Sequence, residues 1–154
     1  YKGIGSAKAI TILAACELGK RRQKATVEEA PILNSAENIY QFMHTTIQDL
    51  DIEEGWVLMM KQNFRLIEAK RISVGGLTMA PVDLRLMMKE VLLKNTTVLA
   101  FCHNHPSGIT NPSRDDDILT SHIHKACELL HIHFADHVIL TDGGYFSYRE
   151  EGKL

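Results

Sequence analysis

The order of hydrophobic and polar residues divides this chain into segments with two different periods. Apolar runs of strand length, separated by turn residues such as Gly, Asn and Asp, predict buried strands. These are residues 56–60, 65–73, 96–102, 132–140 and 145–149. Apolar residues three and four positions apart predict helices at 35–46, 81–94 and 113–130. Because helices alternate with strands, we expect an α/β fold, a mixed β-sheet flanked by helices.

Composition agrees with one compact soluble domain. The chain has 154 residues, of which 45% are hydrophobic and 23% are charged. No apolar run approaches the ~18 residues that a membrane-spanning helix requires, so we expect no membrane insertion. The net charge of −2 argues against nucleic acid covering the whole surface, because phosphate binding requires a basic field. The residues expected in the core are Trp56, Leu58, Val98, Leu99, Phe101, Ile118, Leu129 and Val138.

The cysteines indicate a reducing environment. Cys16, Cys102 and Cys127 are odd in number, far apart and surrounded by apolar residues. This spacing excludes a CxxC zinc ribbon and predicts small core residues rather than a disulfide framework. We therefore expect a cytoplasmic protein. The chain begins at Tyr1 rather than Met, as expected of a piece of a longer protein.

Two histidines at the end of strand 96–102 carry the clearest chemistry. His103 and His105 are two residues apart, and in an extended strand such residues point to the same side. Asp116 follows them across a loop rich in Pro and Gly, which can fold back. Two imidazoles and one carboxylate fill three positions of a tetrahedral zinc site and leave the fourth for water. Such an open position is typical of a catalytic zinc site.

Other polar patterns offer competing interpretations. Ser113 and Asp116 have the spacing of a helix capping box, an interpretation compatible with Asp116 also binding metal. His122 and His124 lie in a predicted helix, where residues two apart diverge by roughly 200° and cannot share one ion. The pair His131–His133 has no acidic residue at a fixed spacing. We interpret His137 as a structural residue or one that orients a ligand.

The motif resembles that of a known family. The string His103-x-His105-Pro106 followed by Ser113-x-x-Asp116 resembles the JAMM metalloprotease signature. Its longer form, with Asn111-Pro112-Ser113 and Asp136-His137-Val138-Ile139, resembles the bacterial RadC family over residues 35–154. The resemblance implies a JAB/MPN architecture related to cytidine deaminases. It also implies a zinc-dependent hydrolase that cleaves a peptide or isopeptide bond in a peptide or protein substrate.

Zinc-assisted hydrolysis also needs a general base. In the JAMM pattern this is a glutamate at the start of the first strand, where Glu53 and Glu54 stand here. RadC proteins usually have an aromatic residue two positions after that glutamate, so the resemblance favours Glu53, with Gly55 replacing the aromatic. Glu54 is the alternative base, and a third interpretation makes both glutamates solvated surface acids of a weak or inactive enzyme. The candidate catalytic residues are therefore Glu53 and Ser113.

The sequence of the N-terminal segment indicates a separate structural element. Gly3-Ile4-Gly5 before an alanine-rich helix resembles the second half of a helix-hairpin-helix over residues 1–23, and residues 24–34 read as a linker. The basic group formed by Lys20, Arg21, Arg22 and Lys24 is either a solvated helix end or a DNA contact. The RadC resemblance implies a DNA-repair association. The alternative function is a DNA-associated binding module with a non-catalytic metal site.

Overall fold

The computed structural model of this chain describes residues 5, 7–8, 10–15, 30–75 and 82–154. The chain divides into two compact units, Tyr1–Ala30 and Pro31–Leu154. In the first unit, residues 10–15 are helical, within the predicted N-terminal helix. Several residues singled out in the sequence lie outside the described residues, namely Cys16, Gly3-Ile4 and the basic group of Lys20, Arg21, Arg22 and Lys24. The DNA association that these residues would carry therefore stays a prediction.

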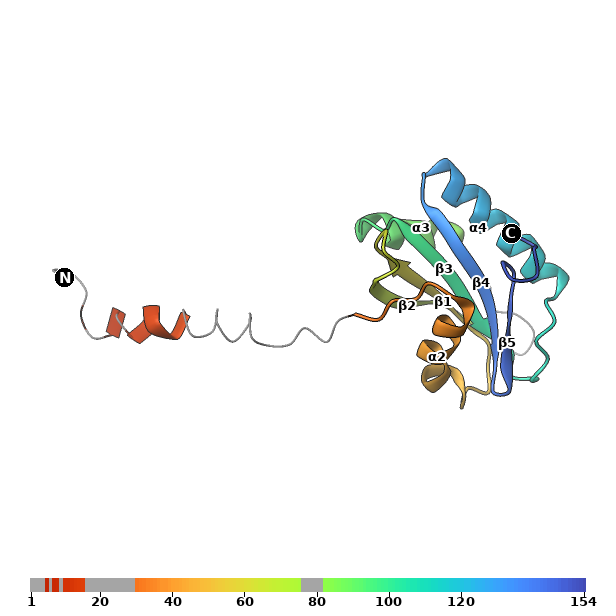
Figure 1. Cartoon of the computed structure of the whole chain (residues 1–154), viewed down its shortest axis with the longest axis horizontal. Coiled ribbons are helices and arrows are strands. Elements are labelled where there is room, and N and C mark those ends of the chain that lie inside the picture. Colours follow the sequence, from red (N-terminus) through yellow and green to blue (C-terminus); the bar gives the residue numbers. More distant parts are fainter. Residues whose placement is uncertain (1–4, 6, 9, 16–29, 76–81) are drawn as a thin grey trace. The chain divides into compact units, whose positions relative to one another are not determined.

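The second unit is an α/β fold built on one mixed sheet (Figure 1). Its strands are β1 (Glu54–Met60), β2 (Leu66–Val74), β3 (Val98–Asn104), β4 (His133–Thr141) and β5 (Gly144–Ser147). The strand order is β2-β1-β3-β4-β5, in which only the β3–β4 pair of these described strands is parallel. This arrangement confirms the predicted fold class. Strand β3 lies at the centre of the sheet and extends to Asn104, two residues beyond its predicted end, so His103 belongs to the strand.

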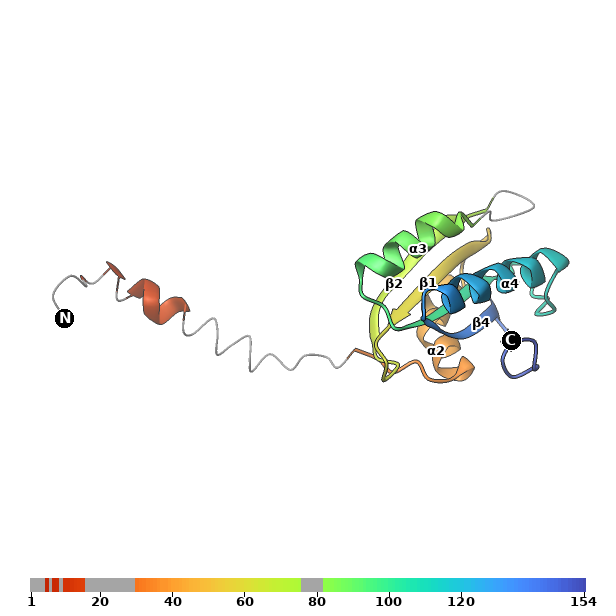
Figure 2. The same cartoon turned by 90° about the horizontal axis from the view of Figure 1, so that it is seen from above.

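Helices cover both faces of the sheet (Figure 2). They are α2 (Ala36–Ile47), α3 (Leu84–Leu93) and α4 (Arg114–Leu129). Ser35 is the N-cap of helix α2, and its side chain accepts a hydrogen bond from the Asn38 amide. The helix buries Ile39 and Met43 against one face of the sheet. Helices α3 and α4 pack on the other face through Met87, Val91, Ile123 and Cys127. The two resulting cores hold the sheet from both sides, and neither includes His103 or His105.

The structure corrects part of the predicted core. Ile118 is 44% exposed and Leu129 is 81% exposed, so both predictions were wrong. Helix α4 buries Thr120 and Cys127, each two residues away from one of these positions. Two residues correspond to roughly 200° around a helix, which places Ile118 and Leu129 on the solvent side.

The two described cysteines match their prediction as core residues. Cys102 and Cys127 are free and buried, and burial raises the pKa of the Cys127 thiol to about 12. In the parts of the chain that the structure describes, no helix has both the length and the apolar character needed to cross a lipid bilayer.

Candidate metal centre

His103 and His105 stand where the central strand leaves the sheet. The His103 Cα is the register partner of Gly55 on β1, and the side chain is almost fully buried. The amide of His105 still donates to the Leu140 carbonyl of β4 at 2.9 Å, so the strand direction continues to this residue. The chain then turns, with the Gly108 amide bonded to the His105 carbonyl at 3.0 Å and Gly108 at a φ of +76°. Glycine suits this left-handed conformation because it has no Cβ.

Asp116 reaches the same place from the start of helix α4. Ser113 is the N-cap, and its hydroxyl accepts a hydrogen bond from the Asp116 amide at 3.2 Å. In return, Asp116 Oδ2 accepts hydrogen bonds from the Ser113 amide at 2.8 Å and from its hydroxyl at 2.7 Å. The capping box predicted from this spacing is therefore present. It anchors one oxygen of the carboxylate at the helix N-terminus.

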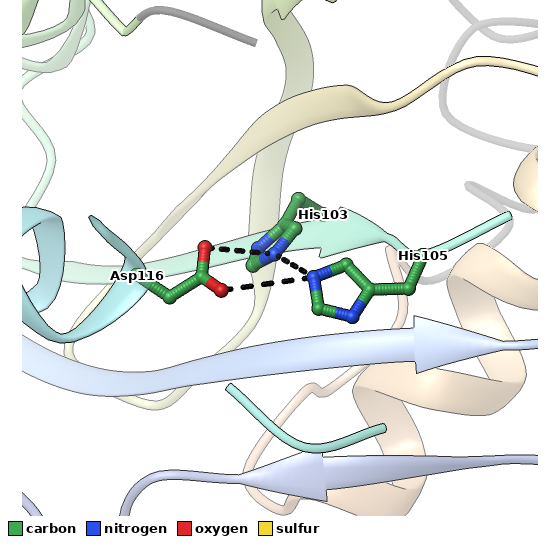
Figure 3. A group of neighbouring side chains, drawn as sticks. All are labelled: His103, His105 and Asp116. Atoms are coloured by element: carbon green, nitrogen blue, oxygen red, sulfur yellow. Dashed lines mark hydrogen bonds and ion pairs between the residues drawn. The ribbon is translucent and has the colours of Figure 1, made fainter. Parts of the chain in front are cut away.

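The three side chains converge (Figure 3). One potential ligand atom from each of His103, His105 and Asp116 lies within 4.8 Å of the others. His103 Nε2 is 3.0 Å from His105 Nε2 and 3.1 Å from Asp116 Oδ1, while His105 Nε2 is 3.7 Å from Asp116 Oδ2. Among the described residues, no other group of His, Cys, Asp or Glu meets this criterion.

The charges of this group suit a cation. Burial alone would raise the pKa of Asp116, but hydrogen bonds with His103 and His105 hold it well below its usual range. Conversely, the hydrogen bond with Asp116 raises the pKa of His105, against the lowering effect of partial burial. Asp116 is therefore ionised, and its negative charge would favour a cation at this place.

The orientation of the His105 ring is fixed by the loop. Its Nδ1 lies 2.7 Å from the Ile109 carbonyl oxygen, which can only accept a hydrogen bond. In the neutral ring, Nδ1 therefore carries the proton and Nε2 presents its lone pair toward His103 and Asp116. This is the tautomer that metal binding through Nε2 requires.

The two candidate bases point to opposite faces of the sheet. Glu53 is half-buried and lines a cavity of about 410 Å³ together with His103 and His105. Glu54 is buried on the other face, where it accepts hydrogen bonds from Arg71 Nη1 at 2.6 Å and from Trp56 Nε1 at 3.2 Å. Only Glu53 of this pair therefore faces the candidate metal residues, as the alternation of side chains along a strand requires.

The cavity combines polar and apolar walls. Its polar residues near the three converging side chains include Ser73, Ser107, Asn111, Ser113 and Asp115. Its apolar wall is formed by Val82, Phe101, Ile109 and Leu119. The cavity therefore offers hydrogen-bonding groups and an apolar surface side by side.

Sequence reasoning missed two residues here. Ser73 lines the cavity from β2, and nothing in its local sequence distinguishes it from other strand positions. Thr120 hydrogen-bonds the backbone carbonyl of Asp116 at 2.6 Å. Its signal was present, because residues four apart on a helix share a face, and Thr120 is four residues after Asp116.

Comparisons with known proteins converge on one family. The profile of the RadC-like JAB domain matches residues 33–153. A UPF0758 protein of Flavobacterium johnsoniae is 39% identical over 152 residues, covering 99% of this chain and 66% of the relative. One of Porphyromonas gingivalis is 35% identical over 155 residues, covering 100% of this chain and 68% of the relative. The chain thus spans about two thirds of the length of these curated relatives.

Proposed function

Since this chain belongs to the family of RadC-like JAB domains, we propose that it is a zinc-dependent hydrolase of peptide or isopeptide bonds. One observation carries the proposal. Two imidazole nitrogens and one carboxylate oxygen converge beside a cavity that also holds a glutamate. Three such ligands with room for a fourth are the donor set of a catalytic zinc site.

The residues present fit zinc. His103, His105 and Asp116 offer the nitrogen and oxygen donors that this ion prefers, and the Asp116 carboxylate supplies negative charge. When bound, zinc supplies a Lewis acid that polarises a carbonyl and lowers the pKa of water. Oxygen-rich sites that favour magnesium or calcium contain more carboxylates than this one.

The protein's own groups complete the chemistry. The Glu53 carboxylate is proposed to accept a proton from the attacking water and to pass it to the nitrogen of the leaving amine. The Ser113 hydroxyl donates to Asp116, so its contribution is to hold that carboxylate in place. The apolar wall of the cavity binds the substrate chain and limits the access of other water.

A set of glutamate and histidine variants tests this proposal. Zinc content is measured by elemental analysis, and cleavage is followed by mass spectrometry of a peptide mixture, in which new amino termini are identified. Glu53→Gln should keep zinc and lose cleavage by about 10²–10⁴, the usual effect of removing a general base. His103→Ala should lose both, because it removes a ligand.

Glu54→Gln is the matched control, since it makes the same chemical change one residue away on the opposite face of β1. It should retain both zinc and cleavage. Cleavage by Glu53→Gln at the parent rate would reject Glu53 as the base, and a loss confined to Glu54→Gln would transfer the role. A parent protein that holds zinc and cleaves nothing would favour the alternative, a binding module with a non-catalytic metal.

A further inference from the structure

Hydrogen bonds continue behind His103, on the side away from His105. His103 Nδ1 is 2.9 Å from His137 Nε2, and His137 Nδ1 is 2.6 Å from the Thr120 hydroxyl. That hydroxyl is 2.6 Å from the backbone carbonyl oxygen of Asp116. The series therefore starts at one candidate metal ligand and ends at the main chain of another.

The direction of each hydrogen bond follows from the last acceptor. The Thr120 hydroxyl donates its single proton to the Asp116 carbonyl oxygen, which can only accept. The Thr120 oxygen is then free only to accept, which requires the proton of neutral His137 to be on Nδ1. His137 Nε2 consequently accepts from His103 Nδ1–H, and this leaves His103 Nε2 as a lone pair facing Asp116.

The side chains that make these hydrogen bonds are held by packing in the protein interior. The His137 ring is fully buried, stacks on Tyr148 with centroids 4.8 Å apart and meets the edge of Phe101 at 5.0 Å. Thr120 is also buried, at 3% exposure. Because both groups are buried, breaking either hydrogen bond would leave a buried polar group unpaired, which is costly.

We propose that Thr120 and His137 are positioning residues, which fix the tautomer and ring orientation of His103 for metal binding. The inference rests on the proposed function, since it assumes that His103 binds the metal. It adds that helix α4 contributes twice to the site, through the Asp116 carboxylate and through the Thr120 hydroxyl. Partners that orient a metal-binding histidine in this way typically change metal affinity by about 10–100-fold when they are removed.

Thr120→Val tests the hydroxyl with almost no change in shape. Zinc affinity is measured by competition with a chromophoric chelator. Thr120→Val should weaken zinc binding by about 10–100-fold, and Thr120→Ser, which restores the hydroxyl, should recover most of the loss. The control is Thr96→Val, because the Thr96 hydroxyl is also buried but has no hydrogen-bond partner among the described residues. This control should bind zinc like the parent.

A second measurement needs no variant and no metal. Long-range proton–nitrogen NMR spectra of the metal-free parent, recorded above the usual imidazole titration range, distinguish the two neutral tautomers. The protons of both His103 and His137 should be on Nδ1. A proton on Nε2 of either ring would overturn the inference, as would a Thr120→Val protein that binds zinc as tightly as the parent.

The two proposals fail in different ways. A parent protein with no zinc affinity would refute the proposed function, whereas the NMR result would still decide the order of the hydrogen bonds. Zinc binding and cleavage that are intact in both the parent and Thr120→Val would refute the positioning role alone.

Discussion

Gly55 provides a sharp test of how tightly the sheet packs beside the candidate metal centre. It lies on β1 between Ser73 of β2 and His103 of β3, its register partners on the two neighbouring strands. A Cβ added at Gly55 would collide with Ser73 Oγ and lie 2.9 Å from Phe101 Cζ. Gly55→Ala should therefore destabilise the fold, although its backbone conformation is one that alanine can adopt.

The size of the loss in stability follows from the atoms that surround the added methyl group. Phe101 is 1% exposed and packs in the core under helices α3 and α4, and Ser73 is 6% exposed, so displacing either side chain disturbs buried contacts. Overpacking of this kind costs about 1–3 kcal/mol. Alanine regains about 0.4–1 kcal/mol by restricting the unfolded chain. We expect a net loss of about 1–2 kcal/mol in the free energy of unfolding.

Urea denaturation followed by circular dichroism measures this loss, and a double-mutant cycle locates its cause. Ser73→Ala removes the hydroxyl that the new methyl group would meet. By itself it should be neutral or stabilising, because the Ser73 hydroxyl is buried without a hydrogen-bond partner among the described residues. Combined with Gly55→Ala, it should recover about 1 kcal/mol or more, since residues in contact are not additive.

Strict additivity of the two substitutions would refute this reasoning. It would mean that the Ser73 hydroxyl does not occupy the space beside Gly55, and that the destabilisation arises from Phe101 alone. A Gly55→Ala protein as stable as the parent would contradict the packing of both neighbours.

Three further predictions concern the metal, the charges and the core. Removing metal with a chelator should leave the far-UV circular dichroism unchanged, because two hydrophobic cores support the sheet; full loss of signal would instead make the metal structural. Asp116→Asn should lower the pKa of His105 in an NMR titration of the metal-free protein, since Asp116 is the main cause that raises it. In the parent, the His105–Asp116 pair stabilises the metal-free fold fully at pH values below the pKa of His105 in the unfolded chain. This contribution is lost as the pH rises through the higher pKa of His105 in the folded chain. Ile123→Ala should cost about 2–5 kcal/mol in urea denaturation, whereas Leu129→Gln on the same helix should stay within about 0.5 kcal/mol; similar losses would contradict the orientation of α4.

The central strands were predictable because their burial is continuous along the chain. The apolar runs before Met60 and His103 are buried on both faces of the sheet, so they are hydrophobic at successive positions and are recognisable as central strands. The same-side placement of His103 and His105 followed from strand geometry and needed no tertiary information. These predictions succeeded because each depends on residues only a few positions apart.

The buried face of α4 and the contact of His137 with His103 depend on helix phase and strand register, which local sequence does not determine. Ile118 and Leu129 are hydrophobic, yet the phase of α4 is set by Ile123 and Cys127 packing under β3 and β4. Likewise, His137 reaches His103 because Phe101 is its register partner, and this pairing follows an irregularity between Leu99 and Ala100. A shift of one residue in that parallel pairing would turn His137 to the opposite face.

Asp116 shows why a complete local explanation did not exclude a second role. The spacing of Ser113 and Asp116 is fully accounted for by the capping box, which alone would stabilise helix α4. However, the cap binds only Oδ2 of the carboxylate, through the amide and hydroxyl of Ser113. The other oxygen, Oδ1, is left facing His103 Nε2 at 3.1 Å. The capping bonds to Oδ2 therefore leave Oδ1 turned toward His103, as metal binding by these residues would require, and the Thr120 hydroxyl on the next turn bonds to the Asp116 carbonyl.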